Sequence, residues 1–171
     1  MSGSRFLAAL AGLGCCLLAG CGFAPLYGDD SAATPVSAQL EQVQVAQIPE
    51  RTGQMLHDTL QDDMQRDGAP VAQLYTLTVD YNINQQGIGI QEDTSSTRTR
   101  FVATATWTLA PIGEPDKAMA TGSATTEDAE NVIDNQYFAS ELEDNTVNRQ
   151  LADEIAAQIT SQVAVYFKTH S

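Results

Sequence analysis

The stretches YTLTVDYNI at 75–83 and TRFVATATWTL at 99–109 decide the fold, because apolar and polar residues alternate along both. Successive side chains of a β-strand point to opposite faces of a sheet, so this alternation predicts two strands, each with one apolar face. The apolar positions are Tyr75, Leu77, Val79, Tyr81, Ile83, Phe101, Ala103, Ala105, Trp107 and Leu109. Gly87 and Gly89 favour β-bulges just beyond the first stretch. A polar turn at 92–96 joins the strands, which we therefore expect to pair antiparallel.

Two weaker strands extend the pattern on either side. Residues 40–48 alternate loosely, with Val43 and Val45 on one face, and 117–126 form a strand of small residues. The side of the sheet opposite the apolar face is then rich in hydroxyl groups. It carries Thr76, Thr78, Thr104, Thr106, Thr108, Thr121, Ser123 and Thr125. Threonine is an ordinary strand residue on a solvated face, but a polar, uncharged face also suits the polar lumen of an outer-membrane β-barrel.

Two helices are predicted from apolar residues at helical spacing. Pro49 suits the start of the first helix, and Gly68 and Pro70 end it. Its apolar positions are Met55, Leu56, Leu60 and Met64. Ser140 and Glu143 have the spacing of a capping box at the start of the second helix. Its apolar residues recur every four positions and are flanked by alanines: Val147, Leu151, Ile155, Ile159, Val163 and Phe167, with Ala152, Ala156 and Ala164.

The order of elements is β-α-β-β-β-α. Three successive strands joined by short connections favour a mostly antiparallel sheet of four strands. Two amphipathic helices can cover one face of that sheet and bury its apolar side chains. The sequence therefore predicts the α+β class, as a two-layer sandwich with the hydroxyl-rich face uncovered.

The N-terminal residues have the pattern of a secretion signal. Arg5 precedes an apolar run at 6–18 that is too short to span a bilayer, and the small residues Ala19 and Gly20 follow it. Leu18-Ala19-Gly20-Cys21 resembles a lipobox, in which the signal is removed before the cysteine and lipid is attached to its sulfur. The alternative is an ordinary secretion signal followed by a chance cysteine.

This pattern divides the chain into three parts. Residues 1–20 are the expected signal peptide, 21–38 the lipidated N-terminus and a flexible tether, and 39–171 the folded domain. Removal of 1–20 takes away one arginine and no acid, so the formal charge changes from −14 to −15. Because nucleic acid selects for basic surfaces, we expect no nucleic-acid partner. Cys21 is the one cysteine left, so the domain is expected to fold without a disulfide.

Residues for catalysis or for metal binding do not form a recognisable motif. There is no GxSxG sequence, and no nucleophile has a base at useful spacing. His57 and His170 are the only histidines, and neither has neighbours at the spacing of a metal site. We expect His57 to be a solvated helix residue, and we expect no enzyme activity, cofactor or metal.

One pair of basic residues stands out in this acidic chain. Arg98 and Arg100 lie two apart on a predicted strand, so both side chains point to the same face near the end of a hairpin. Arginine binds phosphate with two parallel hydrogen bonds, and Lys117 on the neighbouring strand is expected nearby. Alternatively, the arginines are edge-strand charges that discourage aggregation, or partners of acids at 92–93.

Several stretches resemble the LptE family of lipopolysaccharide-assembly lipoproteins. These stretches are CGFAPLYG at 21–28, TRTRFVATATWTL at 97–109, NVIDNQYFA at 131–139, RQLADEIAAQI at 149–159 and VAVYF at 163–167. They span most of the chain after the signal and keep the family's order.

The resemblance implies a fold, a location and a role. It implies two helices on a four-stranded sheet, in a lipoprotein on the periplasmic face of the outer membrane. Gly22 stands where an aspartate would favour the inner membrane. LptE-like proteins help the LptD β-barrel to assemble, plug it, and assist lipopolysaccharide transport to the outer leaflet. The resemblance also implies that Arg98 and Arg100 contact lipid A phosphates. The alternative is a lipid-binding auxiliary lipoprotein of an envelope transport system.

Overall fold

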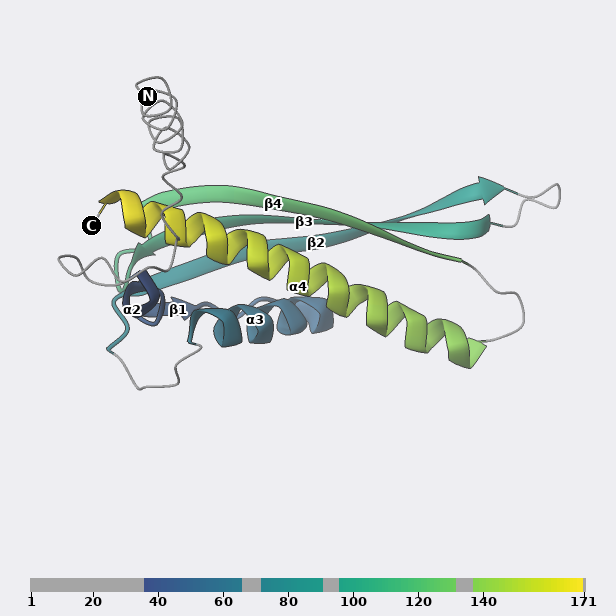
Figure 1. The fold of residues 1–171 in the computed structure, drawn as a ribbon, viewed down its shortest axis with the longest axis horizontal. Coiled ribbons are helices and arrows are strands. Elements are labelled where there is room, and N and C mark those ends of the chain that lie inside the picture. Colours follow the sequence, from purple (N-terminus) through teal and green to yellow (C-terminus); the bar gives the residue numbers. More distant parts are fainter. Residues whose placement is uncertain (1–35, 66–71, 91–95, 132–136, 171) are drawn as a thin grey trace, which may run out of the picture.

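The structure, a computed structural model, describes residues 36–65, 72–90, 96–131 and 137–170 (Figure 1). Its elements, in chain order, are α2 (Val36–Leu40), β1 (Val43–Val45), α3 (Glu50–Met64), β2 (Tyr75–Ile90), β3 (Ser96–Pro111), β4 (Ala120–Asn131) and α4 (Tyr137–His170). The predicted signal peptide, Cys21 and most of the predicted tether lie outside the described residues. The last three residues of that tether, 36–38, belong to α2.

The four strands form one sheet in the order β1-β2-β3-β4. β1 runs parallel to β2, while β2–β3 and β3–β4 are antiparallel. A parallel pair needs a crossover connection, and α3 supplies it between β1 and β2. The predicted α+β class is confirmed, with α2 as an additional short helix. Leu40, which we expected at the start of the first strand, ends that helix.

The β2–β3 hairpin is longer and more regular than its side-chain pattern indicates. Its register runs unbroken from Tyr75 opposite Pro111 to Ile90 opposite Ser96, and Gly87 lies opposite Thr99. A bulge would place two residues opposite one. The predicted bulges are therefore wrong, because the backbone hydrogen bonds of a hairpin continue where side chains are absent.

The fourth strand begins and ends later than we predicted. It runs from Ala120 to Asn131 in place of 117–126, because residues 112–119 form the connection from β3. That connection includes Gly113, whose φ of 82° suits glycine. At its far end β4 extends to Asn131, which lies opposite Arg98.

The predicted capping box is wrong, although the predicted helix is confirmed. α4 begins at Tyr137, so Ser140 lies inside the first turn and not at the cap position. All six apolar positions spaced four residues apart on this helix, from Val147 to Phe167, are buried, as are the three alanines. A step of four residues drifts around a helix of 3.6 residues per turn. The buried stripe therefore winds around the helix and contacts different elements along its length. α4 packs against α3, β4, β3 and α2.

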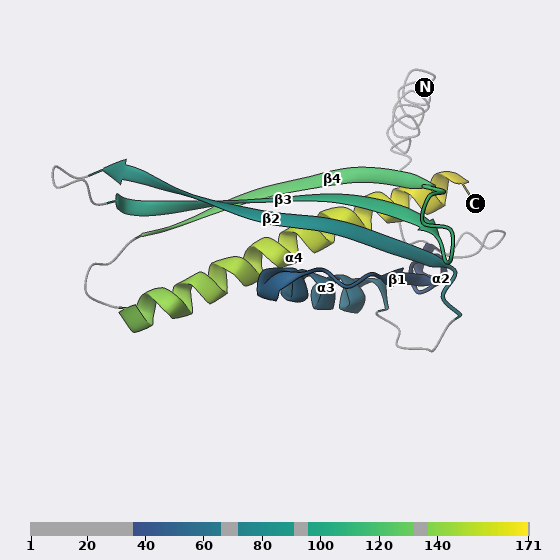
Figure 2. The same cartoon turned by 180° about the vertical axis from the view of Figure 1, so that it is seen from behind.

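Both long helices cover the same side of the sheet (Figure 1, Figure 2). The core between these layers contains the predicted apolar strand positions. Leu77, Val79, Phe101, Ala103, Ala105, Trp107 and Leu109 are all buried. From α3, the core receives Leu56, Leu60 and Met64. No helix in the described part of the chain is both long enough and apolar enough to cross a membrane.

Side chains of α4 cap the outer edge of β4. Gln158 accepts a hydrogen bond from the Thr125 amide (3.3 Å) and donates one to the Thr125 carbonyl (3.2 Å). Gln162 donates to the Ser123 carbonyl (3.0 Å) and accepts from Trp107 Nε1 (2.9 Å). A Cβ atom at Gly122 would lie only 2.6 Å from the Trp107 ring, so glycine provides the room for this contact. The glutamines thus occupy backbone groups of an edge strand that would otherwise be open to pairing.

Candidate functional site

The sheet face opposite the helices is uncovered in both views (Figure 1, Figure 2). Register places its side chains in rows across the three long strands. The central rows are Thr78–Thr108–Thr121, Asp80–Thr106–Ser123 and Asn82–Thr104–Thr125. We call these nine residues the open polar face. Thr108 is half-buried and the other eight are exposed, so the predicted hydroxyl-rich face is confirmed.

Sequence reasoning found the hydroxyl groups of this face but missed its amides. Asn82, Asn84 and Gln86 follow Thr78 at alternate positions of β2, so they point to the same side, and all three are exposed. The sequence contained this signal, because the polar positions that alternate with apolar ones in 75–83 continue as amides to residue 86. Hydroxyl and amide groups both donate and accept hydrogen bonds, so this surface can pair with polar groups of either kind.

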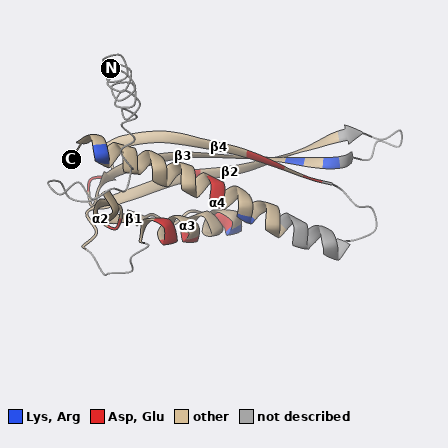
Figure 3. Cartoon of the chain, viewed as in Figure 1, with Lys and Arg blue, Asp and Glu red and all other residues tan. Residues whose placement is uncertain are grey.

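The two arginines lie at the far end of the same face. Arg98 is opposite Ile88 and Asn131, and Arg100 is opposite Gln86 and Ala129. Figure 3 shows this basic segment on the part of the hairpin that extends away from α4. β3 is an inner strand of the sheet, so the alternative of an edge-strand charge is wrong. The other alternative partners, at 92–93, lie outside the described residues.

The side chain of Arg100 is held in place by two contacts, but these do not occupy all the N–H donors of its guanidinium group. Its Nη2 donates to Gln86 Oε1 at 2.7 Å, and its Nη1 lies 3.9 Å from Glu127 Oε2. A guanidinium has five N–H donors, and these two contacts leave others for an anionic group. The Nε atom of Arg100 is buried and has no hydrogen-bond partner among the described residues.

Lys117 does not join the arginines, and that expectation is wrong. It lies in the connection between β3 and β4, where its Nζ is 2.9 Å from Glu114 Oε2. The connection that contains Lys117 ends beside Leu109, whose carbonyl accepts a hydrogen bond from the Met119 amide. Arg98 is at the opposite end of β3, eleven residues before Leu109. At about 3.3 Å per residue, roughly 36 Å of strand separates the two ends. Residues on adjacent strands can lie at opposite ends of a sheet, because the hairpin reverses the chain.

Acidic residues lie on several elements around the arginine pair, and one of them, Glu127, has its Oε2 only 3.9 Å from Arg100 Nη1. Figure 3 shows acids along α3, in the middle of α4 and on the far half of β4. On β4 these are Glu127, Asp128 and Glu130, of which Glu127 shares the arginine face. Charges separated by more than about 8 Å are largely screened at physiological salt. An anion at this site would therefore depend on direct contact with the guanidinium groups.

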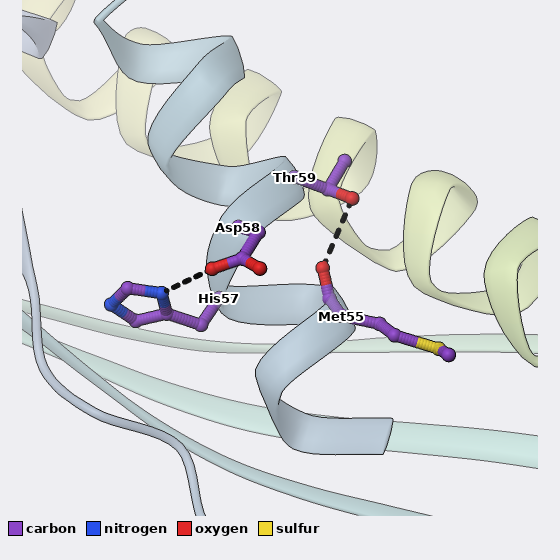
Figure 4. Close-up of polar contacts among 4 residues, drawn as sticks. All are labelled: Met55, His57, Asp58 and Thr59. Atoms are coloured by element: carbon purple, nitrogen blue, oxygen red, sulfur yellow. Dashed lines mark hydrogen bonds and ion pairs between the residues drawn. The ribbon is translucent and has the colours of Figure 1, made fainter. Parts of the chain in front are cut away.

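The histidine on α3 takes part in local contacts. His57 Nδ1 lies 3.1 Å from Asp58 Oδ1, and its side chain is only 18% exposed, so it is less solvated than we expected (Figure 4). Thr59 Oγ1 donates to the Met55 carbonyl at 3.1 Å and to Asp153 Oδ1 at 3.2 Å, which links α3 to α4. Within residues 36–65, 72–90, 96–131 and 137–170, no three His, Cys, Asp or Glu side chains are grouped to hold a metal ion.

The same architecture occurs in three solved bacterial structures. A Caulobacter crescentus CB15 protein described as a lipoprotein has a TM-score of 0.63 at 17% identity, covering 78% of this chain and 96% of its own. The minor lipoprotein of Acinetobacter baumannii has a TM-score of 0.57 at 17% identity, covering 73% and 92%. Rare lipoprotein B of Shewanella oneidensis has a TM-score of 0.54 at 7% identity, covering 75% and 98%. The chain thus has the two-layer fold of a class of bacterial lipoproteins.

Sequence comparison gives the family. The model of the family "LptE: Lipopolysaccharide-assembly" matches residues 40–163, which is more than half of the chain. The protein belongs to the LptE family, as its sequence motifs indicated. No curated protein sequence is significantly similar to it.

Proposed function

We propose that this protein is an outer-membrane lipoprotein, acylated on Cys21, that helps an LptD-type β-barrel to assemble and plugs it for lipopolysaccharide transport to the outer leaflet. The observation that carries the proposal is the open polar face on a member of the lipopolysaccharide-assembly family. The anchor on Cys21 would hold the domain on the periplasmic side. One acyl chain alone binds a membrane only weakly, so two or three chains on this cysteine are expected.

The chemistry of the open polar face suits the inside of a barrel. The lumen of an outer-membrane barrel is polar and in some proteins is filled by a plug. A plug must exchange hydrogen bonds with water for hydrogen bonds with the wall. Threonine, serine and asparagine satisfy this need without the desolvation cost of a buried charge. Asp80 is the one ionised residue in the three central rows, so few charges would need compensation.

Arg98 and Arg100 are the groups that we propose to contact lipopolysaccharide phosphates. They lie beyond the open polar face, on the part of the sheet farthest from α3 (Figure 1). Arg100 keeps N–H donors available beside its contact with Gln86. The protein would act by binding and positioning, without catalysis and without a cofactor.

A pull-down from detergent-solubilised outer membranes tests the role. The full lipidated chain should retain a large β-barrel protein, and deletion of the protein should leave that barrel misassembled. A Thr106→Arg variant places a charge in the centre of the open polar face and should lose the barrel. Gln54→Arg places the same charge on an exposed position of α3 and is the matched control.

Two outcomes would contradict this role. Barrel retention by Thr106→Arg at the level of Gln54→Arg would exclude the open polar face as the contact surface. Lipid bound to the purified chain with no barrel partner, seen by native mass spectrometry, would favour the lipid-binding auxiliary role in place of the plug.

A further inference from the structure

The described part of the chain exposes four large apolar side chains, and all four lie at one end of the molecule. Their exposed fractions are 51% for Leu74, 44% for Ile112, 37% for Met119 and 48% for Val165. They come from four separate segments: the residue before β2, the residue after β3, the residue before β4 and the last turns of α4. We call these four residues the apolar end.

Backbone hydrogen bonds and a shared groove bring these segments together. The Ile112 amide donates to the Leu74 carbonyl at 2.9 Å, and the Met119 amide donates to the Leu109 carbonyl at 2.8 Å. Val165 lines a groove of about 350 Å³ together with Tyr166 and with Ala120, the residue after Met119. The four residues of the apolar end therefore lie on neighbouring segments at the same end of the sheet.

A grouping of this kind indicates a contact surface. Single exposed apolar residues are common on soluble proteins, but contiguous apolar patches mark sites that bind protein or membrane. The opposite end of the sheet presents Arg98, Arg100 and Gln86 instead. The two ends of the molecule thus differ in the kind of partner that they fit.

The position of the chain entry favours the lipid bilayer as the partner. The Gln42 carbonyl, just after α2, accepts the amides of Leu74 (2.8 Å) and Tyr75 (3.2 Å), so the folded body begins beside the apolar end. Residues 21–35 precede α2, and at about 3.3 Å each they reach roughly 50 Å at most. The other end of β3 lies roughly a further 50 Å away by the same rise per residue. A lipid on Cys21 would hold the apolar end nearest to the bilayer.

The charges at this end do not oppose contact with lipid. Glu41, Glu114 and Asp116 lie there with Lys117 and Lys168, and Lys117 pairs with Glu114 at 2.9 Å. The larger groups of acids, on α3, in the middle of α4 and on the far half of β4, lie away from it (Figure 3). Tyr166, beside Val165, is a residue type enriched where proteins meet the membrane interface.

We propose that the apolar end inserts its four side chains into the interfacial region of the bilayer that carries the lipid anchor. The contact places the end of the sheet that carries Leu74, Ile112 and Met119 at the periplasmic surface of that bilayer. This inference rests on the proposed acylation of Cys21, and it adds a second, protein-mediated contact with the same bilayer.

Site-directed spin labelling tests the proposal on the full lipidated chain. Because the lipid occupies Cys21, single cysteines at Leu74→Cys, Ile112→Cys and Met119→Cys can be labelled one at a time. Asn84→Cys and Thr104→Cys, both exposed on the other side of the sheet, are the controls. The proteins are reconstituted in vesicles of phosphatidylethanolamine and phosphatidylglycerol and probed with oxygen, which enters lipid, and with a nickel chelate, which stays in water.

The expected result is that collisions with oxygen exceed those with nickel at positions 74, 112 and 119, with the reverse at 84 and 104. Vesicle-bound protein whose five labels are all accessible to nickel would overturn this inference and leave the anchor intact. Protein that stays in the aqueous phase would overturn the anchor as well. Labels shielded only after a barrel protein is added would overturn the bilayer contact and assign the apolar end to a protein partner.

Discussion

At the scale of single residues, Tyr81 stands out in the core-facing side of β2. Its hydroxyl is buried and has no hydrogen-bond partner among the residues that the structure describes. A buried hydroxyl without a partner costs stability, because it has given up its hydrogen bonds to water. Burial also raises the pKa of Tyr81 from 10.0 to about 12.

We expect Tyr81→Phe to increase the free energy of unfolding at pH 7 by about 1 kcal/mol, because the ring stays and the unsatisfied group is removed. The raised pKa means that the unfolded state loses this proton first, so the folded state is destabilised as pH rises from 10.0 to about 12. Urea unfolding measured at pH 7 and across that alkaline range checks the two points. A wild-type chain that loses no more stability in alkali than Tyr81→Phe would contradict the second.

The role that the charges of Arg98 and Arg100 can play depends on where their strand lies in the sheet. The same charges on an edge strand would mainly discourage pairing with other chains. On the inner strand β3 they project from a sheet face that no helix covers.

We expect Arg98→Glu with Arg100→Glu to weaken lipopolysaccharide binding while leaving barrel association intact. The change reverses the charge at the phosphate site, roughly 20 Å along β3 from Thr106 at about 3.3 Å per residue. Binding of purified lipopolysaccharide and the outer-membrane pull-down would be compared on the same preparation. Arg51→Glu with Arg149→Glu, on exposed positions of α3 and α4, controls for the change in net charge. Undiminished binding by the double variant would reject the site.

At the scale of secondary-structure elements, the edge of β4 depends on α4. Gln158 and Gln162 hydrogen-bond with the outward backbone groups of Thr125 and Ser123. Side chains of a helix thereby take the place of a fifth strand. This arrangement leaves the far half of β4, beyond Thr126, outside the reach of the two glutamines.

Replacing both glutamines by alanine should lower the free energy of unfolding by about 1–2 kcal/mol, since each lost hydrogen bond contributes about 1 kcal/mol and water replaces part of it. The variant should also self-associate more readily through the exposed edge. Urea unfolding and sedimentation measure the two effects. Gln150→Ala, on an exposed position of the same helix, is the control, and equal stability of the two variants would refute the capping role.

At the scale of the whole molecule, the protein has two ends with different chemistry. The apolar end adjoins the start of the folded chain, and the arginines lie at the other end of the sheet, with the open polar face between them. This order would place the lipid anchor, the barrel contact and the phosphate contact in series along one axis.

The anchor itself is open to a direct test. We expect Cys21→Ser to abolish incorporation of radioactive palmitate and to release the protein from washed envelopes, because the sulfur that would carry the lipid is missing. Cys15→Ser, within the predicted signal peptide, should leave both unchanged. A Cys21→Ser variant that still incorporates palmitate would disprove the lipobox assignment.

The amino-acid sequence by itself determined the four strands and the two long helices and which face of each is apolar, although it did not indicate the short helix α2. The alternation in 99–109 and the four-residue spacing from Val147 to Phe167 correspond to buried positions, and the apolar positions in 75–83 are buried or partly buried. This succeeds because side-chain direction follows from local backbone geometry, with a period of two in strands and 3.6 in helices. Strand ends were less predictable, as β4 shows, because they depend on backbone pairing with the neighbouring strand as well as on the side-chain pattern.

Only the tertiary structure decided what lies next to what. It separated Lys117 from Arg98, joined Gln158 to Thr125 across the two layers, and gathered the apolar end from four segments. These relations depend on how distant segments pair and pack. The periodic pattern of apolar residues within one segment does not indicate them. The physical reason is that strand order and register are set by hydrogen bonds and packing between segments far apart in the chain.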